Sequence, residues 1–148
     1  MKWIATIAGA VSLGAQATAA GGVPAEPAVQ PVTSPPSRSI CIIENTDTRS
    51  TFLDAYRAAL EERGFKVAIL KEPETLYDCP MTSTYNAEWA SDQFIGFIYT
   101  IAYARMNVYH DGRMIGYAMW RRPNGYVVRK GDNKVQELVG ELFPGAQP

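Results

Sequence analysis

The chain has 148 residues, enough for one domain, and its 47% hydrophobic and 20% charged residues are ordinary for a globular protein. The formal net charge is −1, and removing an N-terminal signal that carries only Lys2 would leave 13 basic against 15 acidic residues. A nucleic-acid-binding domain needs a basic surface, so this composition argues against a nucleic acid as partner.

A cleavable signal peptide is predicted over residues 1–19. A lysine near the start is followed by an apolar run over 3–13, and residues 17–19 read Ala-Thr-Ala, a cleavage signature. The run is shorter than the roughly 20 residues that span a bilayer. Cleavage after Ala19 or Ala20 is therefore favoured over an uncleaved anchor, with no transmembrane segment in the mature chain. Because no cysteine lies near the cleavage site, there is no lipobox, and we expect a periplasmic or secreted protein.

Residues 20–39 predict a disordered linker ahead of a single α/β domain over 40–145. The segment contains five prolines and almost no large apolar side chains, so it cannot bury enough surface to fold. The alternative is a proline-rich recognition arm.

The stretch from residue 40 to residue 70 predicts a strand, a helix and a second strand. Residues 40–43 form an apolar, β-branched run, and the polar run 45–48 suits a turn and a helix N-cap. Apolar residues then recur at helical spacing up to Gly64, which can end the helix because it tolerates positive φ. Alternation resumes at once, which favours a right-handed βαβ unit with two parallel strands.

The next part of the chain predicts a strand meander. Residues 82–89 alternate as in a half-buried strand, and Ser91-Asp92 is a candidate turn. The apolar run over 94–109 is longer than a usual strand, so we expect a bulge or bend near Gly96, or a short extra turn, before a main strand over 100–109.

Asp111-Gly112 is the strongest hairpin signal, because both residues tolerate the positive φ of a type I′ turn. Residues 113–120 return antiparallel, and a further turn and short strand follow over 123–129. Asp132 is a candidate N-cap for a closing helix over 135–142. The predicted fold class is α/β: a two-layer sandwich in which two helices cover one face of a mixed β-sheet, with β-α-β followed by an antiparallel meander.

Cys41 and Cys79 are the only cysteines, and the export signal would place them in an oxidising compartment. We predict a disulfide between the first strand and the loop after the second. The alternative is two buried thiols. A catalytic redox pair is disfavoured because no C-x-x-C motif is present.

Catalytic, metal and cofactor sites have little support in the sequence. His110 is the only histidine, and no nucleophile turn such as G-x-S-x-G accompanies it. No His or Cys cluster suggests a metal, and no cofactor is expected. Glu88 and Asp92 could pair as in a glycosidase, but acids near a strand end are more often surface groups. An enzyme is therefore disfavoured.

Aromatic residues are concentrated in the meander, and arginines come from the same strands. Tyrosine and tryptophan join an apolar body to a polar tip, which suits a partner interface or a glycan site; ordinary cross-strand packing is the alternative. The broader group includes Tyr99, Tyr103, Arg105, Arg113, Tyr117 and Tyr126. The candidate partner-binding residues are Tyr85, Trp89, Tyr109, Trp120, Arg121 and Arg122.

Several motifs of the folded part allow a family comparison. They are ICIIENT at the first strand, ERGF at the helix end, Cys79-Pro80, YNAEW over 85–89, Asp92, VYHDGRMIGYA in the hairpin and KVQELVGELFP at the end. Over about residues 40–144 the chain resembles small uncharacterised bacterial exported proteins and lipoproteins of the Sbal-type domain. That resemblance implies a compact α/β domain in the cell envelope, with no assigned activity. The sequence departs from the pattern in its lack of a lipobox and in a longer segment between Asp92 and Ala104.

The function that these observations favour is a binding or accessory protein of the cell envelope without catalytic activity, whose partner is an envelope protein. One alternative is an envelope glycan-binding protein or hydrolase, with Trp89, Trp120 and neighbouring acids as the site. Another is an inhibitor or immunity-type protein that neutralises an exported toxin.

Overall fold

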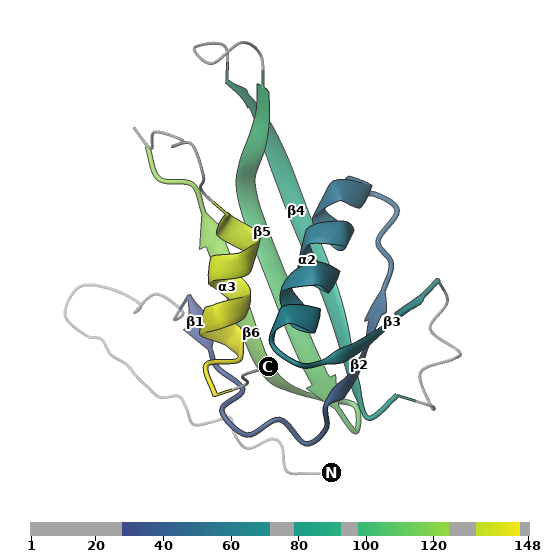
Figure 1. Ribbon diagram of the computed structural model, residues 1–148. Coiled ribbons are helices and arrows are strands. Elements are labelled where there is room, and N and C mark those ends of the chain that lie inside the picture. The colour runs from purple at the N-terminus through teal and green to yellow at the C-terminus, as the bar shows by residue number, and fades with distance from the viewer. Residues whose placement is uncertain (1–27, 72–78, 93–97, 125–132, 146–148) are drawn as a thin grey trace, which may run out of the picture.

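The computed structural model describes residues 28–71, 79–92, 98–124 and 133–145 (Figure 1). Its elements form one six-stranded mixed sheet, in the spatial order β1-β6-β5-β4-β2-β3, and two helices. In chain order they are β1 (Val29–Gln30), β2 (Ser39–Ile43), α2 (Ser50–Glu62), β3 (Lys66–Leu70), β4 (Met81–Asp92), β5 (Ile98–His110), β6 (Arg113–Arg121) and α3 (Lys134–Leu142).

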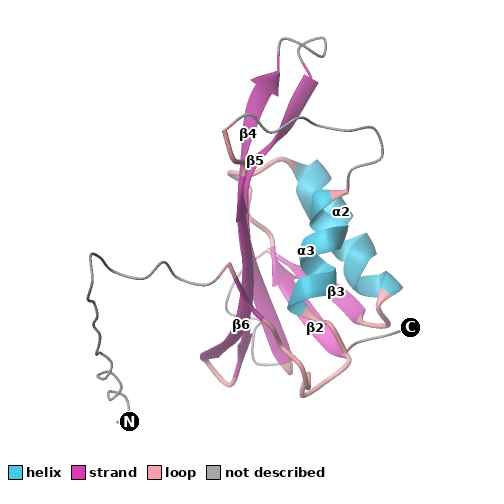
Figure 2. Cartoon of the chain, turned by 90° about the vertical axis from the view of Figure 1, so that its left-hand side faces the viewer, coloured by secondary structure: helices cyan, strands magenta, loops and turns pink. Residues whose placement is uncertain are grey.

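Both helices lie on one face of the sheet, and the ends of β4 and β5 project beyond them (Figure 2). β2 pairs in parallel with β3 and with β4, whereas the β4–β5, β5–β6 and β6–β1 pairs are antiparallel. The predicted fold class and the predicted βαβ unit with parallel strands are therefore confirmed. No helix within the described ranges is long and apolar enough to cross a bilayer.

The core lies between the sheet and the helices. α2 buries one stripe, which contains Phe52, Tyr56 and Leu60, because apolar residues recur every three or four positions. Facing it, alternate residues of each strand point toward the helices, as with Ile40 and Ile42 in β2. Burying each such side chain contributes about 1.5–3 kcal/mol, so this layer is the main source of stability.

The start of α2 differs from the prediction. The polar run does form a turn, because Asn45 Oδ1 accepts a hydrogen bond from the Asp47 N–H at 2.9 Å. No residue of that run is the N-cap, however; the cap position is Arg49, which makes no side-chain capping bond. Thr48 instead donates its hydroxyl to the carbonyl of Ala87 at 3.0 Å, so its side chain binds a strand rather than the helix. The helix stop at Gly64 is confirmed, with φ of 92°.

The closing helix is capped by Asn133 rather than by Asp132. Asn133 Oδ1 accepts the Gln136 N–H at 3.0 Å, which satisfies one of the free donors of the first turn. Asp132 lies outside the described residues, as does most of the turn and strand predicted over 123–129.

The hairpins of the meander are longer than predicted. Ser91 and Asp92 were expected to turn the chain, but both are paired residues of β4, opposite Tyr99 and Ile98. The register shifts between Glu88 and Trp89 in the β4–β5 pair, and between Val108 and Tyr109 in the β5–β6 pair. Gly96, where a bend was expected, lies outside the described residues. The turn at Asp111-Gly112 is confirmed, with φ of 52° and 78°.

The predicted disordered linker is wrong for its second half. Residues 28–38, which we call the N-terminal strap, contain β1, and the Met119 N–H donates to the Ala28 carbonyl at 2.8 Å. Val32 is only 5% exposed and donates its N–H to Leu142 at 2.7 Å, so the strap ties β6 to the end of α3. The domain therefore begins before residue 40, and residues 1–27, with the predicted signal peptide, lie outside the described part.

Gly116 makes room for the strap. A Cβ at this position would collide with the Val32 side chain and would lie 2.7 Å from the Gln30 carbonyl oxygen. The absence of a side chain on β6 therefore allows the strap backbone to approach the sheet closely.

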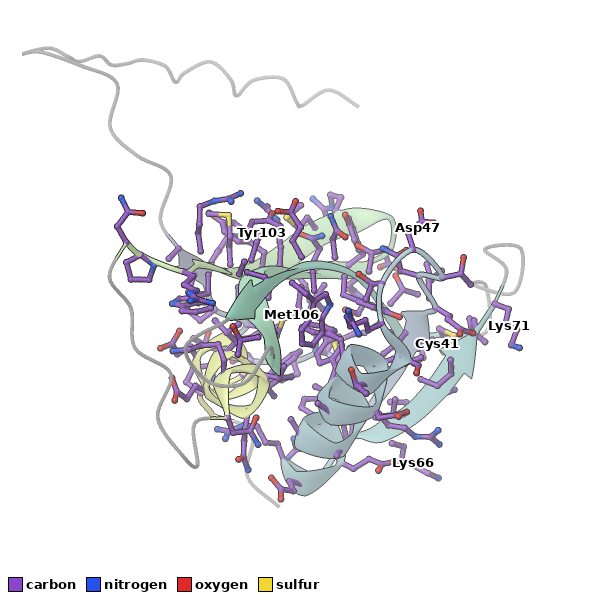
Figure 3. The ribbon with its side chains drawn as sticks, turned by 90° about the horizontal axis from the view of Figure 1, so that it is seen from above. Cys41, Asp47, Lys66, Lys71, Tyr103 and Met106 are labelled. Atoms are coloured by element: carbon purple, nitrogen blue, oxygen red, sulfur yellow. A yellow bond between two sulfur atoms is a disulfide. The ribbon has the colours of Figure 1, made fainter. Side chains whose placement is uncertain are left out.

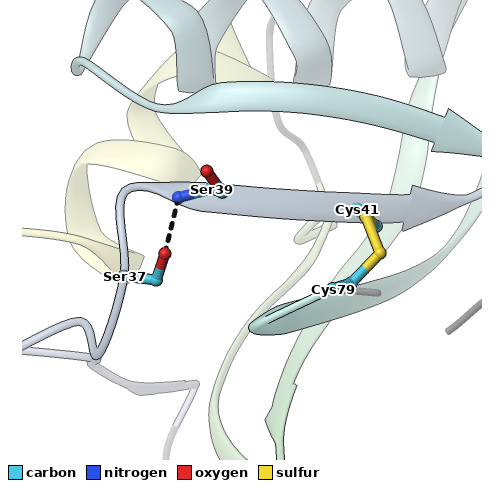
Figure 4. Close-up of a disulfide and its surroundings, with 4 residues drawn as sticks. All are labelled: Ser37, Ser39, Cys41 and Cys79. Carbon is cyan, nitrogen blue, oxygen red and sulfur yellow. Dashed lines mark hydrogen bonds between the residues drawn. A yellow bond between two sulfur atoms is a disulfide. The ribbon is translucent and has the colours of Figure 1, made fainter. Parts of the chain in front are cut away.

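The disulfide between Cys41 and Cys79 is present, as predicted (Figure 4). It joins β2 to the residues before β4, with a Cα–Cα distance of 5.9 Å and a sequence separation of 38. Ile40 and Ile42 belong to the core under the helices, so Cys41 between them points to the other face of the sheet. The bond therefore lies on the helix-free side.

Candidate binding face

The helix-free face of the β4–β5–β6 meander carries the polar and aromatic side chains of the sheet. In β5, Ala104, Met106 and Val108 are fully buried toward the helices, whereas the alternating residues Tyr103 and Arg105 point to the other side. Figure 3 shows Tyr103 and Met106 on opposite sides of the sheet. We call the helix-free surface the open face; its principal residues are Thr84, Tyr103, Arg105, Asn107, Tyr109, Tyr117, Met119 and Arg121.

Two arginines of the open face stack on tyrosines of the neighbouring strand. The guanidinium carbon of Arg121 lies 4.5 Å from the centre of the Tyr103 ring, its direct cross-strand partner. The guanidinium carbon of Arg105 lies 4.3 Å from the centre of the Tyr117 ring, diagonally across the same strand pair. Each stack is a cation–π contact that restricts the rotamers of a long side chain.

A chain of hydrogen bonds fixes Arg105 further. Its Nε donates to Asn107 Oδ1 at 2.8 Å, and the Asn107 amide donates to the Thr84 hydroxyl at 3.2 Å. These side chains span β4 and β5, while Arg105 also reaches the sulfur of Met119 on β6 at 3.9 Å. The face thus holds its guanidinium groups in place, an arrangement that suits recognition of carboxylates or other anions.

Trp89 and Trp120 do not lie on the open face. Both are half-buried on the helix side and pack against the core. Each has a base from the start of a helix over its ring: Arg49 at 5.5 Å from Trp89, and Lys134 at 4.7 Å from Trp120. Trp89 Nε1 is buried and has no hydrogen-bond partner within the described part of the chain. The two rings are therefore packing elements that also carry cation–π contacts.

Tyr85 was a candidate partner-binding residue, but it is a core side chain. It is 4% exposed and stacks on Phe52, with ring centres 5.4 Å apart. Burial raises the pKa of its hydroxyl, against the lowering effect of the bond from the Asn45 backbone. A ring enclosed in this way cannot touch a partner, so Tyr85 leaves the candidate set.

The remaining candidates lie on or beside the open face. Tyr109 is half-buried opposite Thr82 and Met114. Arg122 follows the end of β6, and its guanidinium donates to the Thr100 hydroxyl at 2.6 Å. Tyr103 and Arg105 were missed from the candidate set, although the broader meander group contained them; Tyr117 beneath Arg105 is as buried as Tyr85, at 4% exposed. Alternation along β5 groups Tyr103 and Arg105 with Asn107 and Tyr109, but Tyr117 joins that face only through the register shift between Val108 and Tyr109, which alternation counted from the turn does not reveal.

His110 is tied into the strand ends rather than into a catalytic arrangement. Its Nδ1 lies 2.8 Å from the Pro80 carbonyl oxygen, and its Nε2 lies 3.3 Å from the Asp111 carboxylate. It also borders a hollow of about 350 Å³ beneath the strap. The hollow is lined by Pro31, Val32, Thr33, Ser34, Pro36, His110 and Ile115. Within the described ranges no three His, Cys, Asp or Glu side chains are grouped as a metal site needs.

Comparison with known proteins gives a fold relationship. No family model and no curated protein matches the chain. Among solved structures, the PelC dodecamer from Paraburkholderia phytofirmans in space group P6 matches with a TM-score of 0.56 and 10% identity, over 81% of this chain and 98% of that chain. A variant PelC dodecamer from the same organism, in space group C2, matches with a TM-score of 0.55 and 12% identity, over 81% of this chain and 98% of that chain. This chain has a PelC-like fold.

At such low identity the similarity to PelC establishes the fold alone. The PelC-like fold agrees with the α/β sandwich described above, and it extends over nearly all of PelC. The resemblance to the Sbal-type domain has no bearing on this comparison and stays a prediction.

Proposed function

We propose that this chain is an exported accessory protein of the bacterial cell envelope that acts by binding and assembles with copies of itself. The observation that carries the proposal is the fold relationship: both PelC structures are described as dodecamers, and the similarity spans 98% of the PelC chain. The candidate signal peptide supports export.

The Cys41–Cys79 bond supports an oxidising location. Disulfides form and persist in the periplasm and outside the cell, and they are rare in the cytosol. This bond uses both cysteines of the chain, which is the pattern of a structural crosslink.

The chemistry of the open face supports binding. Arg105 and Arg121 are held by tyrosine rings, and arginine and tyrosine are the residue types enriched at protein interfaces. The glycan alternative rested on Trp89 and Trp120, which pack against the core under Arg49 and Lys134. Among the residues that the structure describes, no specific contact favours that alternative or the inhibitor alternative over a protein interface.

The test is the mass of the oxidised mature protein, residues 20–148, measured by light scattering across a dilution series. We expect a multimer that dissociates on dilution. A monomer throughout would refute assembly. Crosslinking and pull-down from periplasm, with the same protein as bait, would then identify any other envelope protein that it binds.

A further inference from the structure

The outer edge of β6 is only partly covered. β1 is the end strand of the sheet on that side (Figure 1), and its two residues pair with Tyr117 and Ala118. One residue further along β6, the Met119 N–H donates to the Ala28 carbonyl at 2.8 Å, and the described part of the strap begins at Ala28. β6 itself continues to Arg121, so its end extends past the described strap.

The backbone of Arg121 points toward that uncovered edge. Successive residues of a strand direct their N–H and carbonyl groups to its two neighbours in turn. The Met119 N–H faces outward, to the strap, whereas the Arg122 N–H faces inward and donates to the Ala102 carbonyl of β5 at 2.9 Å. Arg121 therefore directs its N–H and carbonyl outward, and among the described residues no strand lies beside them.

The side chain of Arg121 carries a positive charge at the same place. It is exposed on the open face, where its guanidinium lies over the Tyr103 ring. Glu88 lies on the other side of Tyr103, in β4, so its backbone is two strands and roughly 10 Å from that of Arg121. Within the described ranges, none of the ion pairs that form includes Arg121.

The residues just before Ala28 suit this edge. Continuing the β1–β6 register places Glu26 opposite Arg121, and directly opposite residues share a face of the sheet. Pro27 then directs its backbone nitrogen away from β6, and a proline is tolerated on the solvent side of an edge strand because no N–H is needed there. Glu26 precedes this proline and is thereby biased toward extended conformations, which lowers the entropy cost of ordering it.

The same register fixes where the pairing must end. The next hydrogen-bonded position would place Pro24 opposite Pro123. Neither proline has an N–H, so this pair cannot form a backbone hydrogen bond. The ladder can therefore grow by one hydrogen-bonded pair, Glu26 with Arg121, and no further.

We propose that residues 25–27 of the mature protein extend β1 along β6, with Glu26 paired to Arg121 through the backbone and through opposite charge. The occupant of the edge is selected by its continuity with the β1–β6 ladder and by charge complementarity. The extension covers Arg121 at one end of the open face, so a partner that uses this arginine has to displace Glu26 first. The inference does not depend on the proposed assembly, because a monomer would carry the same strand.

The experiment measures hydrogen exchange of single backbone amides by NMR in the oxidised mature protein, residues 20–148. Glu26→Pro removes the N–H that would meet the Arg121 carbonyl. The matched control is Ala25→Pro, the same change at a residue whose nitrogen would point away from β6, as that of Pro27 does. Glu26→Gln keeps the N–H and removes the charge. In each protein, protection of the Met119 N–H shows that the strap is in place.

We expect the Arg121 amide to exchange about fivefold or more slowly in the wild type than in Glu26→Pro, because only the wild type supplies the pairing partner. Ala25→Pro should match the wild type, and Glu26→Gln should lie between the two. The residues beside Arg121 in the sequence are the same in all four proteins, so their unprotected exchange rates at this amide are equal.

Three results would overturn the inference. Equal exchange of the Arg121 amide in the wild type and in Glu26→Pro would mean that the leader does not pair with β6. Equal acceleration by Ala25→Pro and Glu26→Pro would mean that this register is wrong. An amide in Glu26→Gln that exchanges as slowly as in the wild type would remove the ion pair from the proposal.

Discussion

Asn45 donates two hydrogen bonds to Tyr85: its backbone N–H to the tyrosine hydroxyl at 3.0 Å, and its side-chain amide to the tyrosine carbonyl at 3.0 Å. Asn45, in the loop before α2, therefore binds both the side chain and the backbone of Tyr85 in β4. Because α2 has no side-chain N-cap, this attachment takes over the task of fixing where the helix begins.

Tyr85→Phe should lower the free energy of unfolding by about 1–2 kcal/mol, because the Asn45 N–H loses its acceptor while the ring stays in the core. Urea unfolding of the oxidised protein measures this. Tyr109→Phe is the matched control: a half-buried tyrosine on the open face, expected to change stability by less than about 0.5 kcal/mol. Equal effects of the two substitutions would show that the hydroxyl of Tyr85 does not anchor the loop.

Stability should fall at alkaline pH through buried tyrosines. Burial raises the pKa of Tyr56, although its hydrogen bond with Ser83 Oγ at 2.7 Å acts in the opposite direction. The unfolded tyrosine releases its proton first, so the unfolded state binds fewer protons above about pH 10, and stability decreases with rising pH by up to about 1.4 kcal/mol per pH unit. Below pH 10 this group adds no pH dependence.

The Tyr56→Phe variant should therefore show a shallower loss of stability between about pH 10 and pH 12 than the wild type, whatever its stability at neutral pH. Denaturant midpoints at several pH values measure the slope. Parallel slopes for the two proteins would mean that Tyr56 ionises equally easily in both states.

The disulfide should make a large contribution to stability. A crosslink that closes about 40 residues is worth about 4 kcal/mol in the chain-entropy model, against the 5–15 kcal/mol of a typical domain. Replacing Cys41 and Cys79 together by alanine should lower the urea midpoint strongly, and reducing agent should affect only the wild type. A wild-type midpoint that reductant leaves unchanged would contradict a stabilising role.

Gly116→Val should dislodge the N-terminal strap, since the new side chain would occupy the space of Val32 and the Gln30 carbonyl. We expect a loss of about 2–3 kcal/mol and faster proteolysis in residues 28–38. Gly140→Ala is the control: its Cβ would lie 3.6 Å from Arg63 Nη1, an ordinary contact, and alanine in a helix should stabilise by about 0.5–1 kcal/mol. A strap that stays protected in Gly116→Val would refute the close packing.

A chain that begins at residue 40, the boundary suggested by sequence, should be less stable than one that begins at residue 20. Removal of the strap uncovers the edge of β6 and the site of Val32, and an uncovered edge strand is a template for aggregation. Light scattering during heating compares the two chains. Equal onset temperatures would show that the strap is dispensable.

Local signals in the sequence predicted most of the architecture. The βαβ unit was predictable because the helical spacing from Phe52 to Leu60 and the stop at Gly64 are contained in about a dozen residues. The hairpin at Asp111-Gly112 was predictable for the same reason. In each case the deciding interactions lie close together in sequence.

The errors fall where distant residues decide the structure. β1 has only two residues beside a proline. Its pairing with β6 requires that Gly116, far along the chain, has no side chain. Tyr85 and Trp89 alternate correctly, but alternation does not say which face the helices cover. The stacks of Arg105 and Arg121 on tyrosine rings depend on cross-strand register. Composition alone therefore identified the strands of the open face, and it identified Arg121 but not Arg105 as a candidate binding residue.

The strap also limits the reach of whatever precedes it. Its first bond to the sheet is at Ala28, and an extended chain covers at most about 3.6 Å per residue, so the eight residues from a cleavage site at Ala20 to that anchor extend roughly 30 Å. A precursor whose predicted signal peptide is still in the membrane would hold its folded domain within about one domain diameter of the bilayer, with the edge strand β1 as the nearest strand. Until cleavage, the domain would therefore stay close to the membrane, attached at the edge of the sheet where β1 lies.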